Sequence, residues 1–165
     1  RGGHTGKVWF QDLFRHPRYD IALRGGDRIL VEGDTRSFTA LGATGSQSRV
    51  PFESQTLSGV EALAQVGGLM SSTADPTGVF ILRNEPADIA NAVLGRNDLQ
   101  GEQRMVYVLD LTQPNALFMA RDFSVRDGDT LYVTEAPFTQ WSRAISALTG
   151  SLTAVDTLTT APAGL

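Results

Sequence analysis

Short apolar runs along residues 37–83 predict several strands arranged around one helix. The runs at 38–41, 50–52 and 79–82 favour extended structure, and a glycine-rich stretch at 42–46 separates the first two. Between them the apolar positions change to helical spacing. They are Leu57, Val60, Leu63, Ala64 and Val66. The pattern predicts an α+β fold in which a small mixed sheet wraps one main helix.

The ends of this helix are also predicted by residue type. Thr56 or Ser58 can cap the N-terminus, and Glu61 stands three residues after Ser58, as in a capping box. Gly67 suits the left-handed position at the C-terminus, because a residue without Cβ takes a positive φ at no steric cost. We expect Leu69 and Met70 to fold back onto the last turn.

The rest of the central region predicts a sheet that is completed late in the chain. Apolar runs at 106–111 and within 123–133 favour further strands, and the last of these strands follows a Gly-Asp turn at 128–129. The stretch 85–103 is polar and glycine-rich, and we expect a mobile loop with one or two helical turns around 88–94.

An internal repeat suggests that residues 1–35 end an earlier module. Residues 23–31 align without a gap with residues 125–133, and both segments place a Gly-Asp turn before an apolar strand. Within 1–35 we expect strands at 7–10 and 29–32 and a short turn or helix at 12–17. The other interpretation is two unrelated turn-plus-strand pieces. The predicted domains are therefore 1–35, 36–136 and a C-terminal helix with its tail at 137–165.

The C-terminal segment carries an apolar stripe with alternating spacings of three and four residues, which is typical of an amphipathic helix. The stripe comprises Phe138, Trp141, Ile145, Leu148, Leu152 and Val155. A helix over 138–160 would be about 34 Å long, close to the roughly 30 Å hydrocarbon core of a membrane. The stripe suits a membrane or oligomer surface, and it equally suits packing onto the preceding core or a partner module.

Composition excludes several classes of function. The net charge of −4 and the pI near 5.1 oppose nucleic-acid binding, which needs a basic surface. The absence of cysteine excludes disulfides and thiolate chemistry. We see no signal peptide and no stretch of 18 apolar residues, and we expect the chain to be a fragment whose export signal lies upstream.

Residues that carry chemistry do not assemble into a recognisable motif. His4 and His16 lack a third metal ligand at a sensible spacing, and we expect both on the surface. Asp127 and Asp129 flank Gly128 without an EF-hand pattern and are expected to be turn residues. No hydrolase triad or phosphate loop can be proposed. We therefore predict a protein that is not an enzyme and needs no cofactor or metal.

The ordered combination of these elements resembles a known family. The paired glycines before an aromatic strand, the helix that ends at Gly67 and Gly68, and the strand that ends at Arg83 are similar to the SLBB module, a β-grasp domain. Together with the segments at 106–111, 117–120 and 123–133, the pattern looks like that of outer-membrane polysaccharide export proteins. The resemblance extends over about residues 21–150.

This resemblance implies a channel component in the periplasm and outer membrane. The family would form a homo-oligomeric ring that passes a capsule polysaccharide or exopolysaccharide without covalent chemistry. Its partner would be a polysaccharide co-polymerase or an ABC export complex of the inner membrane. The stripe from Phe138 to Val155 would then face lipid, as one stave of an α-helical barrel.

A second hypothesis is a soluble carbohydrate- or ligand-binding β-grasp module. Its sugar-stacking residues would be aromatic, although aromatics in strands are more often core. They would be Phe38, Phe52, Phe80 and Tyr107. A third hypothesis, DNA uptake by an SLBB protein, requires a DNA-binding helical hairpin that we do not find, and the acidic balance opposes it.

Overall fold

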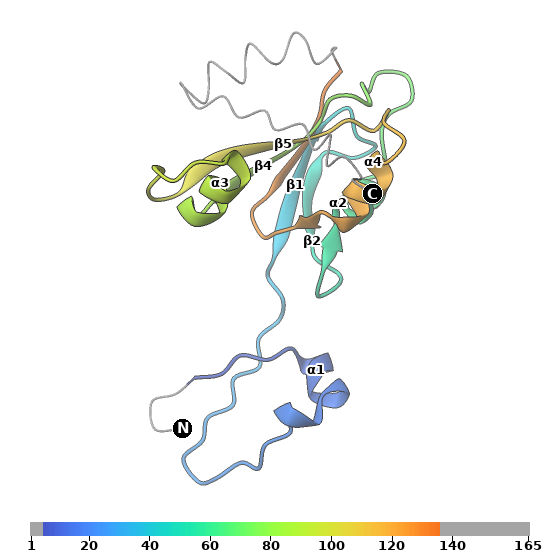
Figure 1. Cartoon of the computed structure of the whole chain (residues 1–165). Helices are drawn as coiled ribbons and strands as arrows, with labels where there is room; N and C mark the ends of the chain where they lie inside the picture. Colours follow the sequence, from blue (N-terminus) through green and yellow to red (C-terminus); the bar gives the residue numbers. More distant parts are fainter. Residues whose placement is uncertain (1–4, 136–165) are drawn as a thin grey trace, which may run out of the picture. The chain divides into compact units, whose positions relative to one another are not determined.

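The computed structural model describes residues 5–135 of the 165-residue chain. The chain divides into two compact units, Arg1–Asp34 and Thr35–Leu165, and each is described by itself (Figure 1). The predicted C-terminal helix and its stripe lie outside the described residues.

The first unit contains helix but no strand among residues 5–34. Helix α1 spans Phe10–Arg15, and a 3-10 turn, η1, spans Pro17–Tyr19. The expected strands at 7–10 and 29–32 are not formed here, since the helix begins at Phe10 and residues 29–32 pair with no strand in the described part of the unit. A strand needs a neighbour for its backbone hydrogen bonds, and residues 5–34 provide none.

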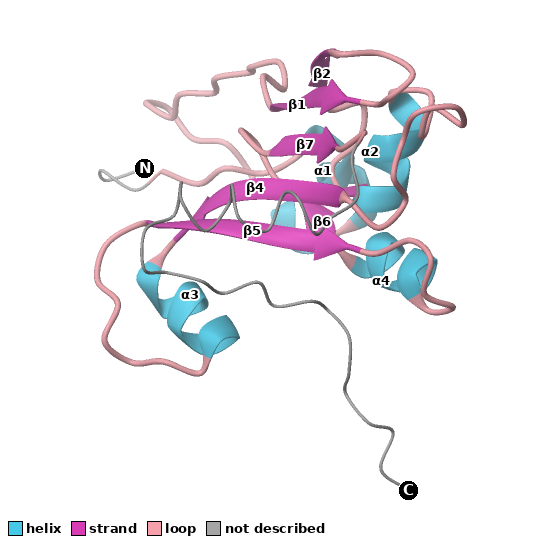
Figure 2. Cartoon of the chain, turned by 90° about the horizontal axis from the view of Figure 1, so that it is seen from above, coloured by secondary structure: helices cyan, strands magenta, loops and turns pink. Residues whose placement is uncertain are grey.

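The second unit is built on a mixed sheet of five strands. Their order is β2-β1-β7-β4-β5 (Figure 2). They span Ser37–Gly42 (β1), Ser48–Pro51 (β2), Val79–Glu85 (β4), Gln103–Leu109 (β5) and Thr130–Val133 (β7). β1 and β7 run parallel, and the other neighbouring pairs are antiparallel. The predicted α+β, β-grasp-like fold is confirmed.

Shorter elements complete this unit. A two-stranded sheet pairs β3 with β6, and three helices connect the strands. They span Leu57–Ser58 (β3), Ser124–Val125 (β6), Gly59–Gln65 (α2), Ala87–Leu94 (α3) and Ala116–Asp122 (α4). α3 lies at the opposite end of the sheet from α2 and α4 in both views (Figures 1 and 2). The sequence predicted one main helix. In the structure two helices, α2 and α4, pack against each other.

The core lies where alternate strand residues meet α2 and α4, as the period of two in a strand requires. The central strands contribute Phe38, Ala40, Val79, Ile81, Leu131 and Val133, all at most 2% exposed. α2 adds Ala62 and Leu63, and α4 adds Ala120. Of the predicted apolar face, Leu57, Leu63 and Val66 are buried and Val60 packs against the core, whereas Ala64 is exposed.

Helix α2 begins and ends largely as its sequence predicts. The Ser58 hydroxyl accepts a hydrogen bond from the Glu61 N–H at 3.3 Å, and the Glu61 carboxylate accepts one from the Ser58 N–H at 2.8 Å. This capping box is confirmed. Gly67 takes a φ of +80° just past the helix, as predicted. Leu69 packs on the core, whereas Met70 stays 42% exposed.

Gly42 allows the end of β1 to approach β7 closely. Its φ is +84°, and a Cβ at this position would fall against the carbonyl oxygen of Val133. The next residue uses that same oxygen, because the Ala43 N–H donates to it at 2.8 Å. Only glycine fits both the backbone conformation and the space.

Candidate functional site

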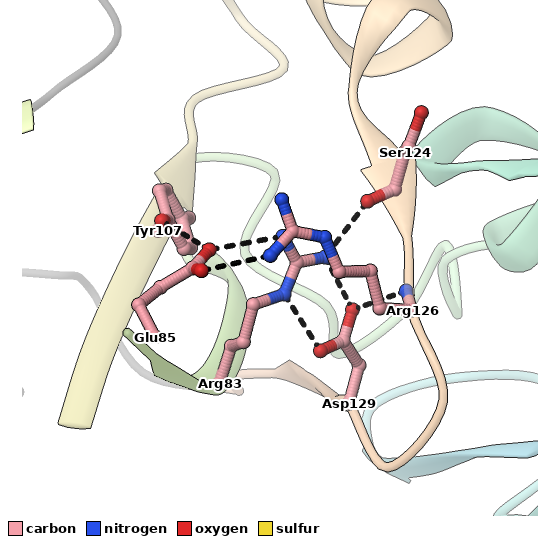
Figure 3. A network of polar contacts seen from close by, with 6 residues as sticks. All are labelled: Arg83, Glu85, Tyr107, Ser124, Arg126 and Asp129. Atoms are coloured by element: carbon pink, nitrogen blue, oxygen red, sulfur yellow. Dashed lines mark hydrogen bonds and ion pairs between the residues drawn. The ribbon is translucent and has the colours of Figure 1, made fainter. Parts of the chain in front are cut away.

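Arg83 is the centre of a buried ionic network between β4 and the turn before β7 (Figure 3). Its Nε and Nη2 atoms donate to the two carboxylate oxygens of Asp129, at 2.8 and 2.6 Å. Nη2 also donates to the Ser124 carbonyl oxygen at 2.7 Å. The two side chains are only 6% and 2% exposed. The planar guanidinium suits this two-point contact, which lysine cannot make.

Glu85 gathers the other half of the network (Figure 3). Its Oε1 accepts from the Tyr107 hydroxyl at 2.8 Å and from Arg83 Nη1 at 3.2 Å. Its Oε2 accepts from Arg126 Nη1 at 2.7 Å. Glu85 is 1% exposed, whereas the Arg126 side chain is 50% exposed. Two arginines thus balance two buried carboxylates, and the Arg126 side chain reaches Glu85 from the surface.

The pKa shifts keep this network ionised at neutral pH. Burial alone would raise the pKa of Glu85, but hydrogen bonds from Tyr107, Arg83 and Arg126 outweigh it and lower that pKa. Burial alone would lower the pKa of Arg83, but Asp129 and Glu85 raise it. Burial, followed by the hydrogen bond to Glu85, raises the pKa of Tyr107 to about 12. Glu85 therefore stays charged and Tyr107 stays protonated across the neutral range.

This arrangement suits a structural role, in which the network holds separate parts of the fold together. None of these three groups has a pKa shifted toward neutrality, which a general acid or base would need. The network instead joins β4, β5 and the turn that leads into β7, segments far apart in the sequence. Asp129 was expected to be a turn residue, and the structure gives it this second role. The sequence showed the Gly-Asp turn that contains Asp129 and the apolar strand that contains Arg83. It did not show that these two residues pair.

The other polar residues that the sequence singled out lie apart from this network. Asp127 lies in the turn, as predicted, and its carboxylate accepts a hydrogen bond from the Ser37 N–H at 2.9 Å. The His16 Nδ1 lies 3.9 Å from an Asp12 carboxylate oxygen. His4 lies outside the described residues. Among residues 5–135, no group of three or more His, Cys, Asp and Glu side chains is placed to hold a metal ion.

The aromatic residues considered for sugar stacking lie in the core. Phe38, Phe52, Phe80 and Tyr107 are 1%, 7%, 1% and 9% exposed. Phe38 packs edge-to-face on Phe52, with ring centroids 6.4 Å apart. Buried rings cannot stack on a sugar at the surface, so these four residues do not form a carbohydrate site.

Among residues 35–135, large apolar side chains are exposed on α4 and on the outer face of the sheet, in addition to Met70 and Val93. On α4, Leu117 and Phe118 are 61% and 60% exposed, while Ala116 and Ala120 on the same helix are buried. On the face of the sheet away from the core, Leu41 and Leu82 are each 41% exposed. These two surfaces belong to opposite layers of the unit. We call them the α4 pair and the outer sheet pair.

The predicted stripe is not placed by the structure. Phe138, Trp141, Ile145, Leu148, Leu152 and Val155 all lie outside the described residues. Within residues 5–135, no helix has the length and apolar character to cross a membrane. The exposed residues of α4 were missed by the sequence analysis, which assigned no helix to 116–122.

Comparison with known families identifies the second unit. The SLBB domain family matches residues 36–133, from the residue before β1 to the end of β7. The chain belongs to the SLBB domain family. In this SLBB domain the ionic network ties the closing turn to β4, and the match ends with the strand that this turn introduces.

The chain is also similar to three named proteins that cover both units. It is 32% identical over 162 residues to the capsule polysaccharide export protein BexD of Haemophilus influenzae. It is 32% identical over 153 residues to the Vi polysaccharide export protein VexA/TviF of Salmonella typhi. It is 31% identical over 155 residues to the EPS I polysaccharide export outer membrane protein EpsA of Ralstonia solanacearum. These alignments cover 93%, 93% and 90% of this chain.

The same alignments cover only part of each relative. The chain spans 41% of the length of BexD and of VexA/TviF, and 37% of EpsA. It therefore corresponds to about two fifths of the curated relatives that it matches.

Proposed function

We propose that this chain is part of a polysaccharide export protein that acts in the periplasm and outer membrane. The observation that carries the proposal is the similarity over about nine tenths of the chain to relatives named for export of capsule, Vi and EPS I polysaccharides. The SLBB match over 36–133 supports the same assignment. The cargo is a capsule polysaccharide or an exopolysaccharide, moved without covalent chemistry.

The unit works as a rigid building block of an oligomer in this proposal. A homo-oligomeric ring requires head-to-tail contacts, in which one surface of a subunit meets a different surface of the next. The α4 pair and the outer sheet pair are two such surfaces on opposite layers of one unit. We propose that the α4 pair of one copy contacts the outer sheet pair of the next. The buried ionic network supports this role, because it ties β4, which carries Leu82, to β5 and to the turn before β7.

The C-terminal stripe connects the ring to the membrane in the same proposal. Phe138, Trp141, Ile145, Leu148, Leu152 and Val155 recur at helical spacing, and a tryptophan suits the membrane interface. Each subunit would contribute one helix to an outer-membrane barrel. The inner-membrane partner would be a polysaccharide co-polymerase or an ABC export complex.

A soluble carbohydrate-binding module remains the competing function. The burial of Phe38, Phe52, Phe80 and Tyr107 removes the stacking residues that would have supported it. Oligosaccharide binding by a monomeric chain would favour this alternative over export.

Deletion of the gene in the source cell tests export directly. We expect surface polysaccharide to disappear while polymer accumulates inside, and a plasmid copy of the full-length gene to restore the surface polymer. The total amount of polysaccharide is the control. It must persist after the deletion, which shows that biosynthesis is still active. Unchanged surface polymer in a strain with no second exporter would contradict the proposal.

A further inference from the structure

The outer face of the sheet, which points away from the core, is buried at one end. Phe80 and Val108 lie opposite each other on β4 and β5 and are only 1% and 3% exposed. The residues on either side of them along both strands belong to the core cluster, but Phe80 and Val108 do not. Because side chains alternate between the two faces of a strand, these two point to the outer face.

Burial on this face decreases along the strands. Leu82, two positions after Phe80, is 41% exposed, and its partner Val106 is half-buried. The next pair on the same face, Asn84 and Arg104, is exposed. The cover of the outer face is therefore confined to the end at which β4 begins.

The three helices of the second unit account for burial on the other face. Each of them places an alanine in the core cluster, Ala62 from α2, Ala90 from α3 and Ala120 from α4. Large apolar side chains on a surface favour a partner that removes them from water. A segment other than these three helices is therefore needed to cover Phe80 and Val108.

The chain leaves the sheet at the same end. Tyr132 of β7 lies opposite Phe80 and stacks on it, with ring centroids 6.4 Å apart and ring planes 18° apart. Two residues later, the Thr134 N–H donates to the Gly78 carbonyl oxygen at 3.0 Å. Residues 136–165 follow Glu135, the last described residue. That segment is thus attached beside the buried end of the outer face.

The apolar stripe of this segment has a spacing that fits the outer face. Pro137 favours a break, after which the chain can reverse and run along β4. A helix rises about 6 Å over the four residues from Trp141 to Ile145. A strand rises about 7 Å over the two residues from Phe80 to Leu82. With Trp141 over Phe80, Ile145 therefore lies over Leu82.

We propose that a helix carrying Phe138, Trp141 and Ile145 docks on the outer sheet face of its own chain in water, where it covers Phe80 and Val108. The outer sheet pair borders the docked helix and stays partly open. Insertion of the stripe into a membrane then requires the helix to leave this face. The inference goes beyond polysaccharide export and concerns the chain outside the membrane, so each proposal can fail without the other.

Fluorescence of Trp141 tests the docking in the 165-residue chain. A Trp9→Phe background leaves Trp141 as the single tryptophan. We expect acrylamide to quench it severalfold less than free tryptophan, because the docked ring is shielded from water. Quenching as strong as that of free tryptophan would overturn the proposal.

A charge on the outer face tests the position of the helix. In the same background, Leu82→Asp should restore strong quenching of Trp141, because the carboxylate would be buried under the helix. Leu117→Asp on α4, an exposed leucine of the other layer, is the matched control and should leave quenching unchanged. Circular dichroism checks that both variants fold. A folded Leu82→Asp chain that still protects Trp141 would overturn the assigned face.

Cross-linking tests which chain supplies the helix, and it also decides the case if Leu82→Asp does not fold. The sequence contains no cysteine, so Leu82→Cys with Ile145→Cys gives one pair for a short bis-maleimide. We expect a link within one chain, which migrates as a monomer in denaturing gels. Leu82→Cys with Arg143→Cys, on the opposite side of the predicted helix, is the control and should link far less. A link between two chains, or equal yields for the two pairs, would overturn the proposal.

Discussion

The Arg83 guanidinium and the Asp129 carboxylate meet through two hydrogen bonds of 2.8 and 2.6 Å, with both side chains at most 6% exposed. Arg96 and Asp98 make nearly the same contact, at 2.9 and 2.6 Å, but their side chains are 40% and 62% exposed. The chain thus contains one ion-pair geometry in two environments. Burial decides how much each pair matters.

Arg83→Met should therefore destabilise the protein strongly. It would leave Asp129 and Glu85 buried without their shared cation, which typically costs roughly 3–5 kcal/mol. Urea unfolding measures the loss. Arg96→Met is the matched control and should change the midpoint little, because water solvates both of its charges. Equal effects of the two substitutions would contradict the structural role of the network.

Glu85 should make the protein sensitive to acid. Its folded pKa lies below the ordinary value of 4.5, so its stabilising contribution is present above that value. The contribution is lost as the pH falls from 4.5 through the lowered folded pKa. Urea midpoints from about pH 7 to about pH 3 should show Glu85→Gln less stable than the wild type near neutrality. The gap should narrow below 4.5, and a constant gap would argue against an ionised Glu85.

Tyr107 should limit stability in alkali. Its pKa rises from 10.0 unfolded to about 12 folded, so its contribution is intact below pH 10 and is lost between 10 and 12. Thermal melts across this range should fall more steeply for the wild type than for Tyr107→Phe. The remaining tyrosines are common to both proteins, so their titration cancels in the comparison. Parallel curves would count against the raised pKa.

Substitutions at Gly42 and Gly68 distinguish two costs of adding a side chain: backbone strain and steric conflict with a neighbouring strand. Both have positive φ, +84° and +73°, but a Cβ at Gly68 meets nothing within 4 Å, whereas at Gly42 it meets the Val133 carbonyl. Gly68→Ala should cost about 1 kcal/mol from backbone strain alone. Gly42→Ala should cost clearly more, because β1 and β7 must separate. Denaturant midpoints of the two variants measure the difference, and equal losses would show that the β1–β7 approach tolerates a methyl group.

The α4 pair gives a test of the proposed subunit contact. Leu117→Ser combined with Phe118→Ser should weaken assembly of the full-length protein at least tenfold, since buried aromatic and aliphatic anchors dominate such contacts. The fold should persist, because both side chains are exposed. Val93→Ser on α3, at a position 37% exposed, is the matched control. Sedimentation measures assembly, and an unchanged oligomer would place the contact elsewhere.

Local patterns predicted much of the second unit. Ser58, Glu61 and Gly67 fixed the ends of α2 because a capping box and a left-handed glycine act within a few residues. The strand at β4 and the turn at Gly128 were also predicted, since their signals are equally local.

Contacts between distant residues were not predictable in this way. Arg83 and Asp129 are 46 positions apart, and nothing local to either indicates the other. Helix α4 was missed because its apolar run, at Leu117 and Phe118, turns outward and carries no clear amphipathic period. The expected strand at 29–32 failed for a related reason, because pairing depends on residues elsewhere.

The parallel pairing of β1 with β7 gives the second unit a direction. Thr39 lies beside Thr130 and Gly42 beside Val133, so the chain enters the sheet at one end and leaves it from the other. If copies of such a unit were joined in tandem, the chain would pass through each copy in the same direction and would not need to return to the end at which it entered. Adding or removing a copy would then change the length of the tandem array, while the direction of the chain through it would stay the same.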